Sequence, residues 1–182
     1  LHKLGTDNPH IILYAEKDGL ISVMEELHEL YGATIITLGG TPSLMSTNYL
    51  VSNMVAAGLD LSREFVCFSL VDFDPDGWDT AIDFLGNLKT FGLKNRHRFQ
   101  QYGQKTERLD LIEPKNLTGE DIGLVRYTLP LTTQRSRLCA TWAELTGGVD
   151  GHGSRKYGLE SDEFTQERIF DLVGQAVAPF LS

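Results

Sequence analysis

The chain has 182 residues, of which 41% are hydrophobic and 23% are charged, which is ordinary for a soluble globular protein. Its net charge of −9 argues against a general nucleic-acid coat protein, and its two cysteines provide no disulfide framework, as expected in a reducing compartment. No apolar run is long enough to cross a membrane, so we expect no membrane partner.

Three strand–helix units are predicted in the first half of the chain. Short apolar runs, each of the length of a buried strand, alternate with longer segments. The first of these longer segments has apolar residues at helical spacing. Repeated strand–helix units predict an α/β fold, with a Rossmann-like parallel sheet flanked by helices and right-handed crossovers. The expected strands are residues 11–15, 33–38 and 65–71, and the expected helices are residues 20–31, a segment from Thr41 or Ser43 to residue 57, and residues 77–91.

The second half of the chain is expected to form an α/β extension. Short strands are predicted at residues 108–112, 123–129 and 155–159, and helices at 133–146 and 163–181. The glycine-rich segment 147–156 lacks the spacing of a phosphate-binding loop, so we expect a linker there. We expect a single domain over residues 1–182 with its core at about 11–130, and, because the sequence does not begin with Met, a fragment of a longer protein.

The third predicted strand ends in a group of carboxylates. Asp72, Asp74 and Asp76 follow it at alternate positions, and Gly77 comes next. Carboxylates at alternate positions of an extended chain share a face, where they repel one another unless a cation lies between them. The pattern predicts a metal site, although Asp, Pro and Gly are also ordinary residues of a strand-to-helix loop.

Two other kinds of site contain a similar pattern. As a loop of twelve residues that ends at Asp83, the segment fits much of the calcium-binding EF-hand pattern. Against this interpretation, the segment follows a predicted strand, the last ligand is normally the longer Glu, and Asp79 stands where an apolar residue is usual. A phosphatase with an aspartyl nucleophile also has D-x-D after a strand, but it needs a small hydroxyl or apolar residue soon afterwards and usually carries the motif on its first strand.

Glu16 is expected to join the carboxylates. It follows the first predicted strand, and parallel strands deliver their carboxyl ends to one edge, where open α/β folds build their sites. This topology brings Glu16 to the same edge as Asp72 and Asp74. Carboxylates can hold Mg²⁺ while leaving positions for a phosphate, so Mg²⁺ is the expected cofactor, with Mn²⁺ as its substitute.

A basic segment interrupts the acidic chain. From Lys89 to Arg108 there are six Lys or Arg residues and one acid, a local charge of +5 that leaves −14 on the remainder. Such a segment is either a solvated loop or a surface that follows a phosphate backbone. In the second case Lys94, Arg96 and Arg98 are candidate DNA contacts.

Three short motifs follow one another at the ends of the predicted strands: A-E-K-D at residues 15–18, T-L-G-G-T-P-S at 37–43 and D-F-D-P-D-G at 72–77. Together they resemble the Toprim domain of topoisomerases, bacterial primases, certain nucleases and recombination proteins. The details are most similar to the A subunit of topoisomerase VI and the related meiotic double-strand-break proteins, with the patterns V-E-K-[DE] and D-x-D-P-[DHY]-G. The resemblance covers about residues 11–93.

The resemblance implies a part of an ATP-hydrolysing type II DNA topoisomerase, which breaks and rejoins DNA by Mg²⁺-dependent transesterification. Glu16 would bind metal and act as general acid or base at the leaving 3′ oxygen. Asp72 and Asp74 would bind metal, Asp76 would reach a second ion, and Lys17 would touch phosphate. The implied partners are DNA, a second copy of the chain and an ATPase B-type subunit. The implied location is intracellular and chromosome-associated, in a cytoplasmic nucleoid or a nucleus.

Part of the family pattern is not matched. The nucleophilic tyrosine of that family lies on a winged-helix domain ahead of the Toprim domain, and no tyrosine of this chain is assigned that role. We therefore expect the chain alone to be inactive. The C-terminal half matches only loosely, and the acidic balance is unusual for a domain that lies along DNA. The alternative is a stand-alone Toprim nuclease or primase-like enzyme, or a catalytically degenerate Toprim module for binding or dimerisation.

Overall fold

A parallel sheet forms the centre of the structure, which is a computed structural model. The structure describes residues 9–37, 39, 43–60, 63, 65–91, 110–135, 137–149 and 156–181. In these residues the sheet has three strands, β1 (His10–Ala15), β2 (Thr34–Thr37) and β3 (Phe65–Leu70), in the order β2-β1-β3. The central strand β1 pairs in parallel with both neighbours. The predicted Rossmann-like α/β fold is confirmed.

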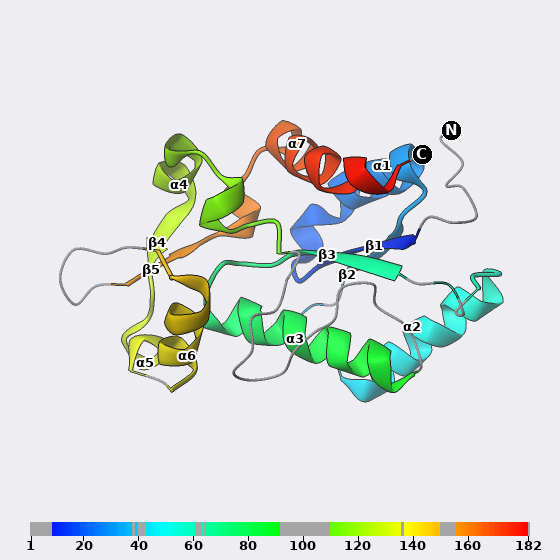
Figure 1. The fold of residues 1–182 in the computed structure, drawn as a ribbon, viewed down its shortest axis with the longest axis horizontal. Coiled ribbons are helices and arrows are strands. Elements are labelled where there is room, and N and C mark those ends of the chain that lie inside the picture. The colour runs from blue at the N-terminus through cyan, green and yellow to red at the C-terminus, as the bar shows by residue number, and fades with distance from the viewer. Residues whose placement is uncertain are drawn as a thin grey trace.

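Helices cover both faces of this sheet (Figure 1). On one face α1 packs against α7, and on the other α2 packs against α3. The alternation of β1 separates the two cores, since Ile11 and Leu13 belong to the first and Ile12 and Tyr14 to the second. β3 is buried along its whole length, as expected for a strand covered on both faces. The bounds of these helices are Ile21–Tyr31 (α1), Leu44–Ala56 (α2), Pro75–Thr90 (α3) and Gln166–Val177 (α7).

The rest of the described chain lies mainly beyond the carboxyl ends of the parallel strands (Figure 1). Strands β4 and β5 pair antiparallel, and Phe73, just after β3, exchanges backbone hydrogen bonds of 3.0 and 3.1 Å with Leu159 of β5. These bonds attach the small strand pair to the segment that carries the aspartates. The remaining elements are the helices α4 (Gly119–Val125), α5 (Leu131–Gln134) and α6 (Arg137–Thr146), the strands β4 (Arg126–Thr128) and β5 (Tyr157–Leu159), and the 3₁₀ turns η1 (Asp18–Leu20), η2 (Pro114–Asn116), η3 (Ser161–Glu163) and η4 (Ala178–Phe180).

Several predicted elements of the second half are wrong in type or extent. The segment 123–129, expected as one strand, consists of the end of α4 followed by β4. The helix forms there because Thr118 and Asp121 cap its start reciprocally. In place of a strand at 108–112, Asp110 makes a single parallel bridge to Ser69 and the chain soon enters η2; residues 108 and 109 lie outside the described part.

The helical predictions for this half also need correction. The helix expected at 133–146 is two helices, α5 and α6, and the last helix begins at Gln166 because Thr165 caps it. The strand expected at 155–159 is present over the shorter range of β5, and residue 155 lies outside the described part. Within the described residues, no helix combines the length and apolarity that crossing a bilayer requires.

Candidate functional site

Four carboxylates gather at the carboxyl edge of the sheet. Glu16 comes directly after β1, Asp72 comes shortly after β3, and these two strands are paired in register to their last residues. We call Glu16, Asp72, Asp74 and Asp76 the acidic edge. The structure therefore brings together the side chains that parallel topology places at one edge.

Ionisation of Glu16 is opposed by its surroundings. Burial raises the pKa of Glu16 most, and the charges of the three aspartates raise it further, while Lys17 acts in the opposite direction. A bound cation would relieve this repulsion, because an opposite charge favours the ionised carboxylate. The acidic edge therefore has the electrostatic character of a cation site.

Asp72 is held by groups from two distant segments. Its Oδ1 accepts hydrogen bonds from the backbone N of Ser161 at 2.8 Å and from the Ser161 hydroxyl at 2.6 Å. Its Oδ2 lies 2.9 Å from Nζ of Lys17. Since a carboxylate oxygen has about two acceptor positions, Oδ1 is fully used and only Oδ2 remains open to a metal.

Asp74 is the N-cap of α3. Its Oδ1 accepts a hydrogen bond of 2.7 Å from the backbone N of Gly77, and its Oδ2 accepts one from the hydroxyl of Tyr127. Burial raises the pKa of Asp74, and these two hydrogen bonds oppose that effect. Burial and the neighbouring Asp74 also raise the pKa of Tyr127, which keeps the phenol a donor. Each oxygen of Asp74 retains one acceptor position.

Asp76 is the most open member of the acidic edge. It lies exposed in the first turn of α3, where the helix dipole favours a negative charge. Gly77 follows it, and a Cβ at this position would overlap the carbonyl oxygen of Asp72. The glycine of the D-x-D-P-x-G motif is thus required because two backbones approach closely.

Lys17 forms a direct ion pair with the acidic edge. Its ammonium forms ion pairs with Asp72 at 2.9 Å, with Asp162 at 3.4 Å and with Glu160. Burial lowers the pKa of Lys17, but the hydrogen bonds and charges of Asp72 and Asp162 outweigh it and raise the value overall. The side chain expected from the resemblance to touch phosphate is therefore a charged partner of the acidic edge itself.

The helix start decides between the alternative interpretations of the aspartates. Because α3 begins at Pro75, residues 75–83 are helical, and Asp83 is exposed on that helix. The EF-hand interpretation is therefore wrong, since its loop would have to extend to Asp83. The strand-to-helix interpretation explains Asp74 as a cap, but it explains neither Asp72 nor Glu16.

The donor set suits Mg²⁺, which prefers oxygen ligands and is commonly held by one or two carboxylates. Among the residues that the structure describes, however, no three His, Cys, Asp or Glu side chains are arranged to hold a metal ion. Lys17 takes one of the two acceptor positions of Asp72 Oδ2, so a metal at the other position would lie beside its ammonium charge. The oxygen ligands of the acidic edge fit the cation, and the Lys17 ammonium already offsets part of their negative charge.

Sequence reasoning missed the residues that hold the aspartates. Tyr127 and Ser161 lie 53 and 89 positions from their partners, and no local pattern connects them. A weak signal was present in Glu160 and Asp162, which follow a strand in the manner of Glu16. The predicted DNA contacts Lys94, Arg96 and Arg98 lie outside the described residues.

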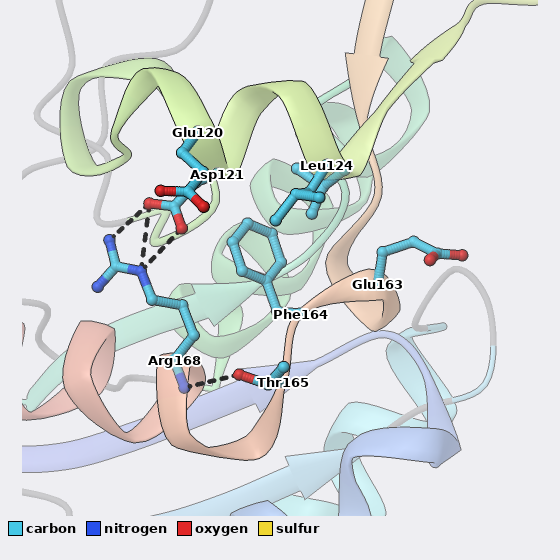
Figure 2. A pocket seen from close by; sticks show the side chains of 8 residues that line it. Glu120, Asp121, Leu124, Glu163, Phe164, Thr165 and Arg168 are labelled. Carbon is cyan, nitrogen blue, oxygen red and sulfur yellow. Dashed lines mark hydrogen bonds and ion pairs between the residues drawn. The ribbon is translucent and has the colours of Figure 1, made fainter.

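A separate pocket of about 220 Å³ lies between α4 and the start of α7 (Figure 2). Phe164 and Leu124 line its apolar side, and the guanidinium of Arg168 binds both oxygens of Asp121 at 2.9 to 3.2 Å. Arg168 holds the pKa of Asp121 below its ordinary value. Because this charge pair is internal to the protein, the pocket is a weaker candidate than the acidic edge.

Comparison with known proteins adds no relative. No protein-family model matches the sequence, and no curated protein matches it significantly. The acidic edge and the motifs at the strand ends are therefore the features that point to a function.

Proposed function

We propose that this chain is the Mg²⁺-dependent Toprim part of a type IIB topoisomerase-like protein that breaks and rejoins DNA. The observation that carries the proposal is the acidic edge: Glu16 and three aspartates, which follow the neighbouring strands β1 and β3, gather at one end of the sheet, where the aspartates oppose the ionisation of Glu16. We also propose DNA, a second copy of the chain and an ATPase subunit as partners. The three motifs at the strand ends support these assignments.

Each carboxylate has a role in this proposal. Asp72 and Asp74 would hold the metal, and their fixed hydrogen bonds would limit the rearrangement that binding requires. When bound, Mg²⁺ would offset negative charge at the scissile phosphate. Glu16 would exchange a proton with the leaving 3′ oxygen, a task that its raised pKa favours because the group then holds a proton closer to neutral pH.

Calorimetric titration of the full chain with Mg²⁺ and with Mn²⁺ tests the metal site. We expect Glu16→Gln, Asp72→Asn and Asp74→Asn each to weaken metal binding by about tenfold or more, since each replaces a charged ligand by a neutral side chain of similar size. Asn remains an effective helix cap, so Asp74→Asn keeps the start of α3.

Asp83→Asn is the matched control. It removes one carboxylate from an exposed position of α3, outside the acidic edge, and should leave the affinity unchanged. Equal affinities in all four variants would contradict the proposed site.

A second candidate is a degenerate Toprim module in which Lys17 permanently replaces the metal. The observation that favours it is the set of ion pairs between Lys17 and Asp72, Glu160 and Asp162. The same titration distinguishes the two functions, because a degenerate module would bind neither Mg²⁺ nor Mn²⁺ in its unmodified form.

A further inference from the structure

We propose that Tyr127 is a positioning residue for Asp74, whose carboxylate it holds in the orientation needed to bind metal. This inference rests on the proposed function, because it assigns a supporting residue to the same acidic edge. Tyr127 belongs to β4 and reaches Asp74 from 53 positions away in the sequence, so the contact is made only by the tertiary fold.

The two oxygens of Asp74 are bound from different elements. Oδ1 accepts the backbone N–H of Gly77 in α3, and Oδ2 accepts the phenol of Tyr127 in β4. A single hydrogen bond would leave the carboxylate free to rotate about its Cβ–Cγ bond. Two donors on opposite oxygens fix the plane of the group and still leave one acceptor position on each oxygen.

Gly158 provides the space for the Tyr127 ring. The two residues are directly opposite in the β4–β5 pair, and a Cβ on Gly158 would lie 2.8 to 2.9 Å from ring and hydroxyl atoms of Tyr127. The ring therefore lies across the α-carbon of Gly158, an arrangement that only glycine permits without displacement. The strand pair is thus built so that this phenol reaches Asp74.

β5 also fixes the strand pair to the acidic edge. Phe73, between the two aspartates, exchanges two backbone hydrogen bonds with Leu159, and Ser161 holds Asp72. Tyr127 is consequently attached to a frame that is bonded to the two residues directly before Asp74, Asp72 and Phe73. Groups that orient a metal ligand commonly change metal affinity by about 10- to 100-fold when they are removed.

The test compares Tyr127→Phe with Tyr157→Phe in the full chain. Both substitutions remove one hydroxyl from the same strand pair, but the Tyr157 ring lies under Arg126, with 4.5 Å between the guanidinium carbon and the ring centre. Titration with Mg²⁺ should show about a tenfold loss of affinity for Tyr127→Phe and none for Tyr157→Phe. Gly158→Ala keeps the phenol but displaces the ring, and it should weaken Mg²⁺ binding as well.

Thermal unfolding and electron paramagnetic resonance of bound Mn²⁺ separate positioning from a purely structural role. A positioning role predicts an altered Mn²⁺ spectrum in Tyr127→Phe at temperatures where that variant is fully folded. A lowered Tm with unchanged Mg²⁺ affinity and an unchanged spectrum would overturn the inference and leave the proposed function intact. If titration of the unmodified chain showed no metal binding, both the inference and the proposed function would be overturned, and this titration alone identifies that outcome.

Discussion

The charge of Glu16 links the acidic edge to the stability of the fold. Its pKa is raised by burial and by the three aspartates, so the folded protein binds this proton more tightly than the unfolded chain does. The contribution of Glu16 to the free energy of unfolding therefore falls as the pH rises from the ordinary glutamate pKa through the raised one. Above the raised pKa, the full penalty for the buried charge is present.

Replacing Glu16 by Gln should remove this pH dependence. The variant is expected to be more stable than the unmodified chain above the raised pKa, and the two stabilities should converge as the pH falls and Glu16 becomes protonated. Urea unfolding in metal-free buffer across the carboxylate titration range measures the difference. Glu29→Gln, at an exposed position of α1, is the control and should show no such trend.

Two glycines of α3, Gly77 and Gly86, offer a matched pair of substitutions within one helix. Gly77→Ala places a methyl group against the carbonyl oxygen of Asp72, and it should destabilise the protein by about 1–3 kcal/mol or more by forcing the helix start away from β3. Gly86→Ala adds its methyl group in open space on the exposed side of the same helix, and it should stabilise by about 0.5–1 kcal/mol. Chemical denaturation of both variants provides the comparison, and equal effects would show that the close approach at Gly77 does not constrain the fold.

The elements that could be predicted are those with local causes. The three parallel strands follow from short buried runs, and the start of α2 follows from Ser43, whose side chain accepts the backbone N–H of Ser46 at 3.1 Å. In contrast, the strand predicted at 123–129 overlaps the end of α4, a short helix whose start depends on the reciprocal caps of Thr118 and Asp121. The sequence predicted which carboxylates meet, but the partners of Asp72 and Asp74 depend on how β5 docks, which local patterns do not encode.

The distribution of charge governs how the whole molecule could approach DNA. At about 0.15 M salt, charge fields extend only about 8 Å, so local charge matters more than the net charge of the chain. The basic segment from Lys89 to Arg108 has a local charge of +5, and it begins in the last turn of α3, the helix that Asp74 caps. It is therefore the strongest sequence candidate for a surface that follows a phosphate backbone.

Replacement of Lys94, Arg96 and Arg98 by Ala tests this surface. Each lost phosphate contact should flatten the log–log salt dependence of DNA binding by about 0.9, giving about two to three units for the triple variant. Mg²⁺ affinity should not change. A control with the same loss of charge replaces the exposed Lys115, Arg135 and Arg137, and an equal effect of the two triple variants would identify the basic segment as a solvated loop.

The attachment of β5 to the acidic edge also has a consequence for the order of folding. The carboxylates occupy the first 76 residues, whereas Tyr127, Glu160 and Ser161 are synthesised much later. Joining Asp72 to Ser161 closes a loop of 89 residues, at a chain-entropy cost of roughly 4 kcal/mol from the logarithmic dependence on loop length. While the chain grows on the ribosome, the parallel strands can therefore pair before their carboxylates acquire these partners. The carboxylates thus come together early and gain their hydrogen-bond partners late, so the geometry of the acidic edge depends on the slow, long-range contacts of the folding reaction.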